Sequence, residues 1–104
     1  GEQDGAGGVL AGAGRAQEAL ATVERGLRMA PSNAELHQMK GRLLLAAGDV
    51  AAARASLERA RGLDPQNVLV RVDLAALYRN QGRLDAALRE SEDAARIAPD
   101  VAEA

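Results

Sequence analysis

The sequence contains no cysteine, which excludes disulfides and thiolate metal sites. It also contains no Phe and no Trp, and Tyr78 is its one aromatic residue. An aromatic-lined ligand pocket and a base-stacking surface for nucleic acid are therefore not expected. No apolar run approaches the roughly 20 residues of a membrane-spanning helix, so direct membrane insertion is not expected either.

The chain also has no large excess of charge of either sign. The 13 basic and 15 acidic side chains are interspersed, the net charge is -2, and no basic stripe for nucleic acid is present. Lysine is nearly absent, since 12 of the basic residues are Arg and only Lys40 is Lys. This usage, with the abundance of Ala and Gly, suggests a GC-rich bacterial genome. The compartment stays open between bacterial cytoplasm and periplasm.

Alanine is what the chain has most of, with 24 of its 104 residues. The length allows one small domain. Because alanine buries little area, the core must rely on close approach of helices rather than on bulky side chains. The absence of an initiator Met and of a signal-peptide segment suggests that the sequence comes from a longer protein.

An internal repeat of 34 residues organises the chain. Helix breakers recur at this spacing, as Gly14, Gly48 and Gly82 and as Pro31, Pro65 and Pro99. Small and apolar residues recur with them: Ala19, Ala53 and Ala87; Gly7, Gly41 and Ala75; Leu10, Leu44 and Tyr78; Met29, Leu63 and Ile97. The glycines and the prolines each recur three times at this spacing. The sequence therefore predicts three units with the same structure.

Each unit is predicted to be a pair of antiparallel helices. In the second unit the helices span 34–47 and 50–62, and Ser32 with Glu35 forms a capping-box pattern before the first. Gly48 suits a left-handed residue that ends a helix, and Asp49 can cap the next one. Pro65 ends the second helix. Gly41 and Ala53 would let the two backbones approach closely.

The third unit follows the same plan, with helices over 68–81 and 83–97, Asn67 as the cap and Gly82 as the break. The first unit is weaker, because six glycines lie within residues 1–14 and each costs a helix interior about 1 kcal/mol. We expect a frayed start, secure helix only from Val9 or Leu10, and a second helix over 15–29. The last residues read as the opening of a further unit.

These residues resemble the tetratricopeptide repeat family, whose members are 34-residue helix-turn-helix units. The matching positions are the small residue in the first helix (Gly41, Ala75), the large residue after it (Leu44, Tyr78), the glycine break (Gly48, Gly82), the alanines of the second helix (Ala53 with Ala60, Ala87 with Ala94) and the closing proline (Pro65, Pro99). The resemblance implies an all-α superhelix, a solenoid with repeats over 1–33, 34–67 and 68–101 and the start of a further repeat or cap at 102–104.

The chain departs from the family pattern at four positions. His37 and Arg71 replace an aromatic residue, Lys40 replaces a leucine, and Ser91 replaces a large residue. The register predicts that His37 and Lys40 lie at the surface. The register also allows a comparison with one sub-family, the domains that clamp the C-terminal tails of chaperones. These domains use Lys, Asn and Arg at five positions, where this chain has Asp4, Gly8, Met39, Leu69 and Asp73. The chain does not match a chaperone-tail clamp.

No catalytic constellation is visible in the sequence, so we expect no enzyme, no cofactor and no metal. His37 is the single histidine, and Gly12-Ala13-Gly14 lacks the glycine spacing and the following Gly-Lys of a phosphate loop. The carboxylates Asp85, Glu90, Glu92 and Asp93, beside Arg89 and Arg96, are read as a solvated helix face.

The resemblance implies a partner-binding groove lined by the first helix of each repeat. Its predicted residues are Glu35, Gln38, Arg42, Leu45, Leu69, Val72, Ala76, Arg79 and Asn80, with Asn33 and Asn67 near the rim. Arg42, Arg79 and Asn80 are the polar anchors expected to hold the partner, because arginine can grip a carboxylate with two hydrogen bonds.

The expected function is therefore a non-catalytic scaffold that binds a protein or peptide segment. Two alternatives stay open. The chain can be a structural spacer or self-associating part of a bacterial assembly, of the secretion, pilus, envelope or polysaccharide-export kinds that the resemblance implies. It can also be the targeting domain of a larger enzyme.

Overall fold

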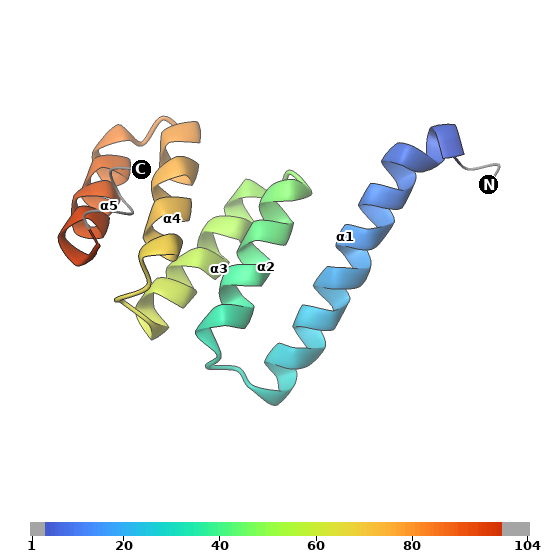
Figure 1. Cartoon of the computed structure of the whole chain (residues 1–104), viewed down its shortest axis with the longest axis horizontal. Coiled ribbons are helices and arrows are strands. Elements are labelled where there is room, and N and C mark those ends of the chain that lie inside the picture. Colours follow the sequence, from blue (N-terminus) through green and yellow to red (C-terminus); the bar gives the residue numbers. More distant parts are fainter. Residues whose placement is uncertain (1–3, 99–104) are drawn as a thin grey trace.

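The computed structural model describes the backbone of residues 4–98 and the side chains of residues 14–98. This part of the chain contains five helices and no strand: α1 (Asp4–Met29), α2 (Ala34–Ala46), α3 (Val50–Leu63), α4 (Val68–Asn80) and α5 (Leu84–Ile97). The helices lie side by side in chain order, each antiparallel to the one before (Figure 1). The predicted all-α helical repeat is confirmed.

The helix pairs of the second and third repeats begin and end within one residue of the predicted bounds. Asp49 caps α3 by accepting a hydrogen bond from the Ala52 amide at 3.3 Å. Asn67 caps α4, as predicted, and accepts from the amides of Leu69 and Val70. Gly48 and Gly82 adopt positive φ angles of 87° and 75°, which favour glycine because a Cβ atom crowds the backbone there.

The predicted capping box before α2 is wrong. The cap is Asn33, whose Oδ1 accepts a hydrogen bond from the Leu36 amide at 3.0 Å. Ser32 lies one residue too early to reach the same free amides, and asparagine is at least as good a cap as serine. The cap therefore matches Asn67, one repeat later.

The predicted helix break at Gly14 is also wrong, because α1 continues through it as one helix of 26 residues. A glycine inside a helix costs only about 1 kcal/mol, and breaking the helix there is favourable only if a closed hairpin buries enough apolar area. Before Gly82 the chain offers Leu74, Leu77 and Tyr78 for this purpose, whereas before Gly14 it offers mainly glycine and alanine. The predicted frayed start falls partly on residues 1–3 and the further unit on residues 99–104, outside the described residues.

The core lies between α2, α3, α4 and α5. Its most fully buried large side chains are Leu57, Leu74, Leu77 and Val70, with Ala53 and Ala60 beside them at 0% exposure. A Cβ atom built on Gly41 would lie 2.6 Å from Leu57 Cγ and 3.3 Å from the Ala53 carbonyl oxygen. The predicted close approach of the two helices at Gly41 is thus present.

His37 and Lys40 are half-buried and lie outside the core. His37 Nε2 is 2.8 Å from the Pro31 carbonyl oxygen, which ties the start of α2 to the preceding turn. Lys40 forms an ion pair with Glu24 of α1 at 3.2 Å. Both residues were predicted to lie at the surface. Each is instead partly covered, and its polar end contacts a neighbouring group.

Replacing Gly48 with alanine is expected to lower the free energy of unfolding by about 1 kcal/mol, because alanine is strained at positive φ. Urea denaturation measures this change. Gly62→Ala is the matched control: Gly62 lies inside α3 without a left-handed φ and with no neighbour in the way of a Cβ. It should stabilise the protein by roughly 0.5–1 kcal/mol, the helix propensity difference. Equal effects of the two changes would contradict the description of the turn.

Candidate interaction surface

The residues predicted to line a groove lie on α2 and α4, but two of them are covered. Gln38 is buried: its amide nitrogen is 3.4 Å from Asp73 Oδ2, and its amide oxygen is 3.5 Å from Asn67 Nδ2. Leu45 is half-buried and packs against the core cluster. Both side chains are therefore engaged within the array and are not freely available to a partner.

Arg42 is exposed but already has an ion-pair partner. Its Nε donates to Asp73 Oδ2 at 2.9 Å, and its side chain keeps 54% of its surface exposed. An exposed pair of this kind contributes about 0–1 kcal/mol, so a carboxylate of a binding partner can compete for Arg42. The ion pair between Arg42 and Asp73 was not predicted from the sequence, although Asp73 lies next to the predicted groove residue Val72.

The α4 part of the surface is open and largely apolar. Leu69 is 52% exposed and Val72 40%, and Ala76, Arg79 and Asn80 are exposed beside them. Met39 on α2, at 44%, is a further exposed apolar residue that was not included in the predicted set. Single exposed apolar residues are ordinary, but these residues lie on the first helices of neighbouring repeats, which makes them the candidate interaction surface.

Comparison of the two complete repeats separates two kinds of position within the predicted set. Leu69, Ala76 and Asn80 occupy the places of Glu35, Arg42 and Ala46, all of which stay exposed although α4 covers their repeat. Val72 and Arg79 occupy the places of Gln38 and Leu45, which are covered. The first group is exposed in both repeats. The second group is covered in the second repeat, whereas Val72 and Arg79 are exposed in the third.

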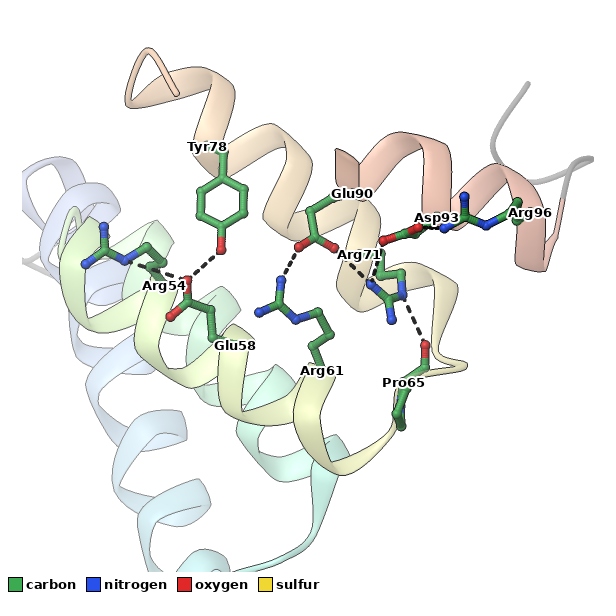
Figure 2. A network of polar contacts seen from close by, with 9 residues as sticks. All are labelled: Arg54, Glu58, Arg61, Pro65, Arg71, Tyr78, Glu90, Asp93 and Arg96. Carbon is green, nitrogen blue, oxygen red and sulfur yellow. Dashed lines mark hydrogen bonds and ion pairs between the residues drawn. The ribbon is translucent and has the colours of Figure 1, made fainter. Parts of the chain in front are cut away.

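A network of ion pairs joins α3, α4 and α5 on another side of the array (Figure 2). At its centre is Glu90, only 6% exposed, which accepts from Arg61 of α3 and, at 3.2 Å, from Arg71 of α4. Arg71 also reaches Asp93 at 3.5 Å and donates to the Pro65 carbonyl oxygen at 3.0 Å.

The interpretation of Glu90 as part of a solvated face is therefore wrong. Its oxygens lie between two arginines of neighbouring helices, which compensates the cost of burying a carboxylate. Asp93, which pairs with Arg96 one turn on, is half-buried. Asp85 and Glu92 are exposed, as predicted. The network fixes the position of α5 against α3 and α4, and its acids are held in ion pairs.

Tyr78 contributes a second contact between repeats. Its hydroxyl donates to Glu58 of α3 at 2.5 Å, and the Arg83 guanidinium lies 4.8 Å from the ring centre. Burial raises the pKa of the Tyr78 phenol, and the hydrogen bond to Glu58 adds to this effect because the neutral phenol is the donor. The folded protein therefore keeps this proton at pH values where the unfolded chain loses it.

Tyr78→Phe is expected to remove a stability loss at alkaline pH. A raised pKa in the folded state contributes stability that is complete below the ordinary tyrosine pKa of about 10 and decreases as the pH rises above it. At pH 7 the variant should lose about 1 kcal/mol with the Glu58 hydrogen bond. Urea denaturation from pH 7 to about 11 should then show a smaller alkaline decrease for the variant than for the wild type. Parallel curves would contradict the assignment.

Two family models, both described as tetratricopeptide repeat, match residues 5–67 and 44–104. The chain belongs to the tetratricopeptide repeat family. The two matches overlap at residues 44–67, within the second repeat, and together they support about three repeats. Proteins of this family generally bind proteins or peptides, and the fold is typically a non-catalytic scaffold.

Solved tetratricopeptide structures have the same fold. The chain is 35% identical to TTC0263, a thermophilic TPR protein of Thermus thermophilus, with a TM-score of 0.77 over 83% of this chain and 44% of that one. It superposes on MamA with a TM-score of 0.77 at 21% identity, over 81% of this chain and 49% of MamA. The chain thus spans less than half the length of these structures.

A longer protein also matches in sequence. The chain is 37% identical over 87 residues to the probable biofilm formation methyltransferase WspC of Pseudomonas putida. This match covers 84% of the chain but only 20% of WspC. Within the described residues, no three His, Asp or Glu side chains come together in a way that could hold a metal ion. None of the described helices is both long and apolar enough to cross a membrane.

Proposed function

We propose that this chain is a non-catalytic binding module that holds a protein segment on the joint face of α2 and α4. The observation that carries the proposal is the group of exposed apolar side chains on these two helices, Met39, Leu69 and Val72, with Arg42 and Arg79 beside them. A segment that fits this face has apolar residues for its centre and at least one carboxylate for the arginines.

Electrostatics supports a partner with acidic groups. Arg79 has no ion-pair partner among residues 14–98, and Arg42 shares its charge with Asp73 only at the surface. A partner carboxylate that reached Arg42 would need no deep desolvation, since the Arg42 side chain is 54% exposed. The apolar contacts would supply most of the affinity, and the arginines would set the orientation of the bound segment.

A second candidate function is suggested by WspC, whose name describes a methyltransferase. We propose under this alternative that the chain serves as a docking unit of a larger enzyme and brings it to a protein partner. The matched part is a fifth of WspC, and the chain itself supplies no catalytic group in our proposal. The face of α2 and α4 would have the same role in both cases.

Selection of binding peptides from a random library tests the proposed surface. Leu69→Asp, and separately the pair Arg42→Ala with Arg79→Ala, should weaken binding of the selected peptides by about tenfold or more, as expected for central interface residues. Arg59→Ala is the matched control, because Arg59 is an exposed arginine on α3. Unchanged affinity in the folded variants, or an equal loss with Arg59→Ala, would show that the surface is assigned wrongly.

A further inference from the structure

An ion pair joins α2 to α4 within the proposed binding face. Arg42 of α2 donates through Nε to Asp73 Oδ2 of α4 at 2.9 Å. The same oxygen lies 3.4 Å from the amide nitrogen of Gln38, whose amide oxygen is 3.5 Å from Asn67 Nδ2. The ion pair is therefore the exposed end of a short chain of polar contacts that crosses from the second repeat to the third.

This part of the face is open in both complete repeats. Arg42 and Ala76 occupy equivalent positions, as do Met39 and Asp73, since the members of each pair are 34 residues apart. Arg42, Met39 and Ala76 are exposed, and Asp73 is half-buried. The second repeat stays open here although the third repeat packs beside it, so a partner can reach the ion pair.

The two members of the ion pair are held unequally. The side chain of Arg42 is 54% exposed, whereas that of Asp73 is 21% exposed and has Gln38 as a second donor. Gln38 is itself buried. Arg42 can therefore turn toward a bound segment while Asp73 keeps the Gln38 hydrogen bond, so that the carboxylate is not left without a donor.

We propose that Asp73 determines how strongly the face selects segments that carry a carboxylate. This inference rests on the proposed function, in which Arg42 binds such a carboxylate. In the free protein Asp73 neutralises Arg42, so a neutral segment can cover the pair without burying an unpaired charge. An acidic segment must displace Asp73 from Arg42 and then lies close to its negative charge, which reduces the gain from the new ion pair. Asp73 thus makes the face tolerant of segments that have no acid at this place.

Matched peptides that differ in one carboxylate test this role. A peptide selected from a random library is made again with each of its carboxylates replaced in turn by the corresponding amide. A double-mutant cycle with Arg42→Ala identifies the carboxylate that contacts Arg42. The selectivity for acid is then the dissociation constant of that amide peptide divided by the dissociation constant of the acid peptide.

Asp73→Asn should increase the selectivity for acid by about two- to fivefold, the range that an exposed ion pair supplies. Asparagine keeps the size of the side chain and an acceptor oxygen for Gln38, and circular dichroism checks that the helices persist. In an Arg42→Ala background the same change should have no effect on the selectivity. Asp85→Asn is the matched control, because it removes an exposed negative charge from α5 and should leave the selectivity unchanged.

The outcomes separate this inference from the proposed function. If a peptide carboxylate couples to Arg42 but Asp73→Asn leaves the selectivity for acid unchanged, the role of Asp73 is wrong. A lower selectivity would also overturn it, and would mean that Asp73 positions Arg42 for the partner instead. An equal increase with Asp85→Asn would show a general effect of net charge and would contradict the proposal. The proposed function fails differently: no carboxylate couples to Arg42 and Leu69→Asp leaves the affinity unchanged, which would remove the basis of this inference as well.

Discussion

Glu90→Ala is expected to lower the free energy of unfolding by about 2 to 3 kcal/mol, among the largest losses for any single change of a charged residue in this chain. Glu90 is 6% exposed and accepts from Arg61 and Arg71, whose side chains are 32% and 14% exposed. Among residues 14–98, removing the carboxylate leaves the more buried Arg71 with Asp93 as its one neutralising charge. The expected loss is smaller than the roughly 3–5 kcal/mol for a fully buried pair, because Arg61 can turn toward solvent.

The matched control is Glu92→Ala, an exposed glutamate on the same helix, which should change the free energy of unfolding by no more than about 0.5 kcal/mol. Glu90→Gln keeps the size and one acceptor oxygen but loses the charge, so its loss should lie between those of the two alanine variants. Urea denaturation at pH 7 measures all three. A Glu90→Ala loss no larger than that of Glu92→Ala would mean that the network does not hold α5.

Leu57→Ala is expected to cost about 3 kcal/mol, within the range for truncating a fully buried leucine. Leu57 is 0% exposed and lies against Gly41, where the two helices of the second repeat come close together. The site cannot collapse easily, because α4 covers it from the other side and the neighbouring alanines are already small. Urea denaturation measures the loss, and Met29→Ala is the control, since Met29 is 88% exposed.

Gly41→Ala tests the same contact from its other side. Although alanine is the better helix former, its Cβ would lie 2.6 Å from Leu57 Cγ, so the change should cost about 1–3 kcal/mol. In a Leu57→Ala background the Cβ meets less obstruction, and the cost should shrink or reverse. A double-mutant cycle measures this coupling. Additive effects of the two changes would contradict the described packing.

Much of the fold could be predicted from the sequence because its signals are local. The breakers Gly48 and Gly82 act through their own backbone angles, and caps such as Asp49 and Asn67 act within three residues. The 34-residue period then places the helices in order, since each repeat packs on its neighbour. Gly41 was predictable for a similar reason, because a small residue in mid-helix marks close approach.

The features that the sequence did not indicate depend mainly on contacts between residues far apart in the chain. The burial of Glu90 follows from Arg61 and Arg71, which lie 29 and 19 residues earlier in the chain. The cover over Gln38 likewise comes from Asp73 and Asn67 of the next repeat. Helix α1 continues through Gly14 because the residues before this glycine supply too little apolar area to stabilise a closed hairpin. Comparing equivalent positions of the two complete repeats would have revealed part of this, because inter-repeat contacts recur with the period.

The central claim is that the joint face of α2 and α4 binds a protein segment. Amide chemical-shift mapping by NMR, with a peptide selected from a library, tests it most directly. The largest shifts are expected to cluster at Met39, Arg42, Leu69 and Ala76 and to be absent from the exposed positions of α3, such as Ala55 and Arg59. Shifts that cluster on α3, with Met39 and Leu69 unmoved, would contradict it.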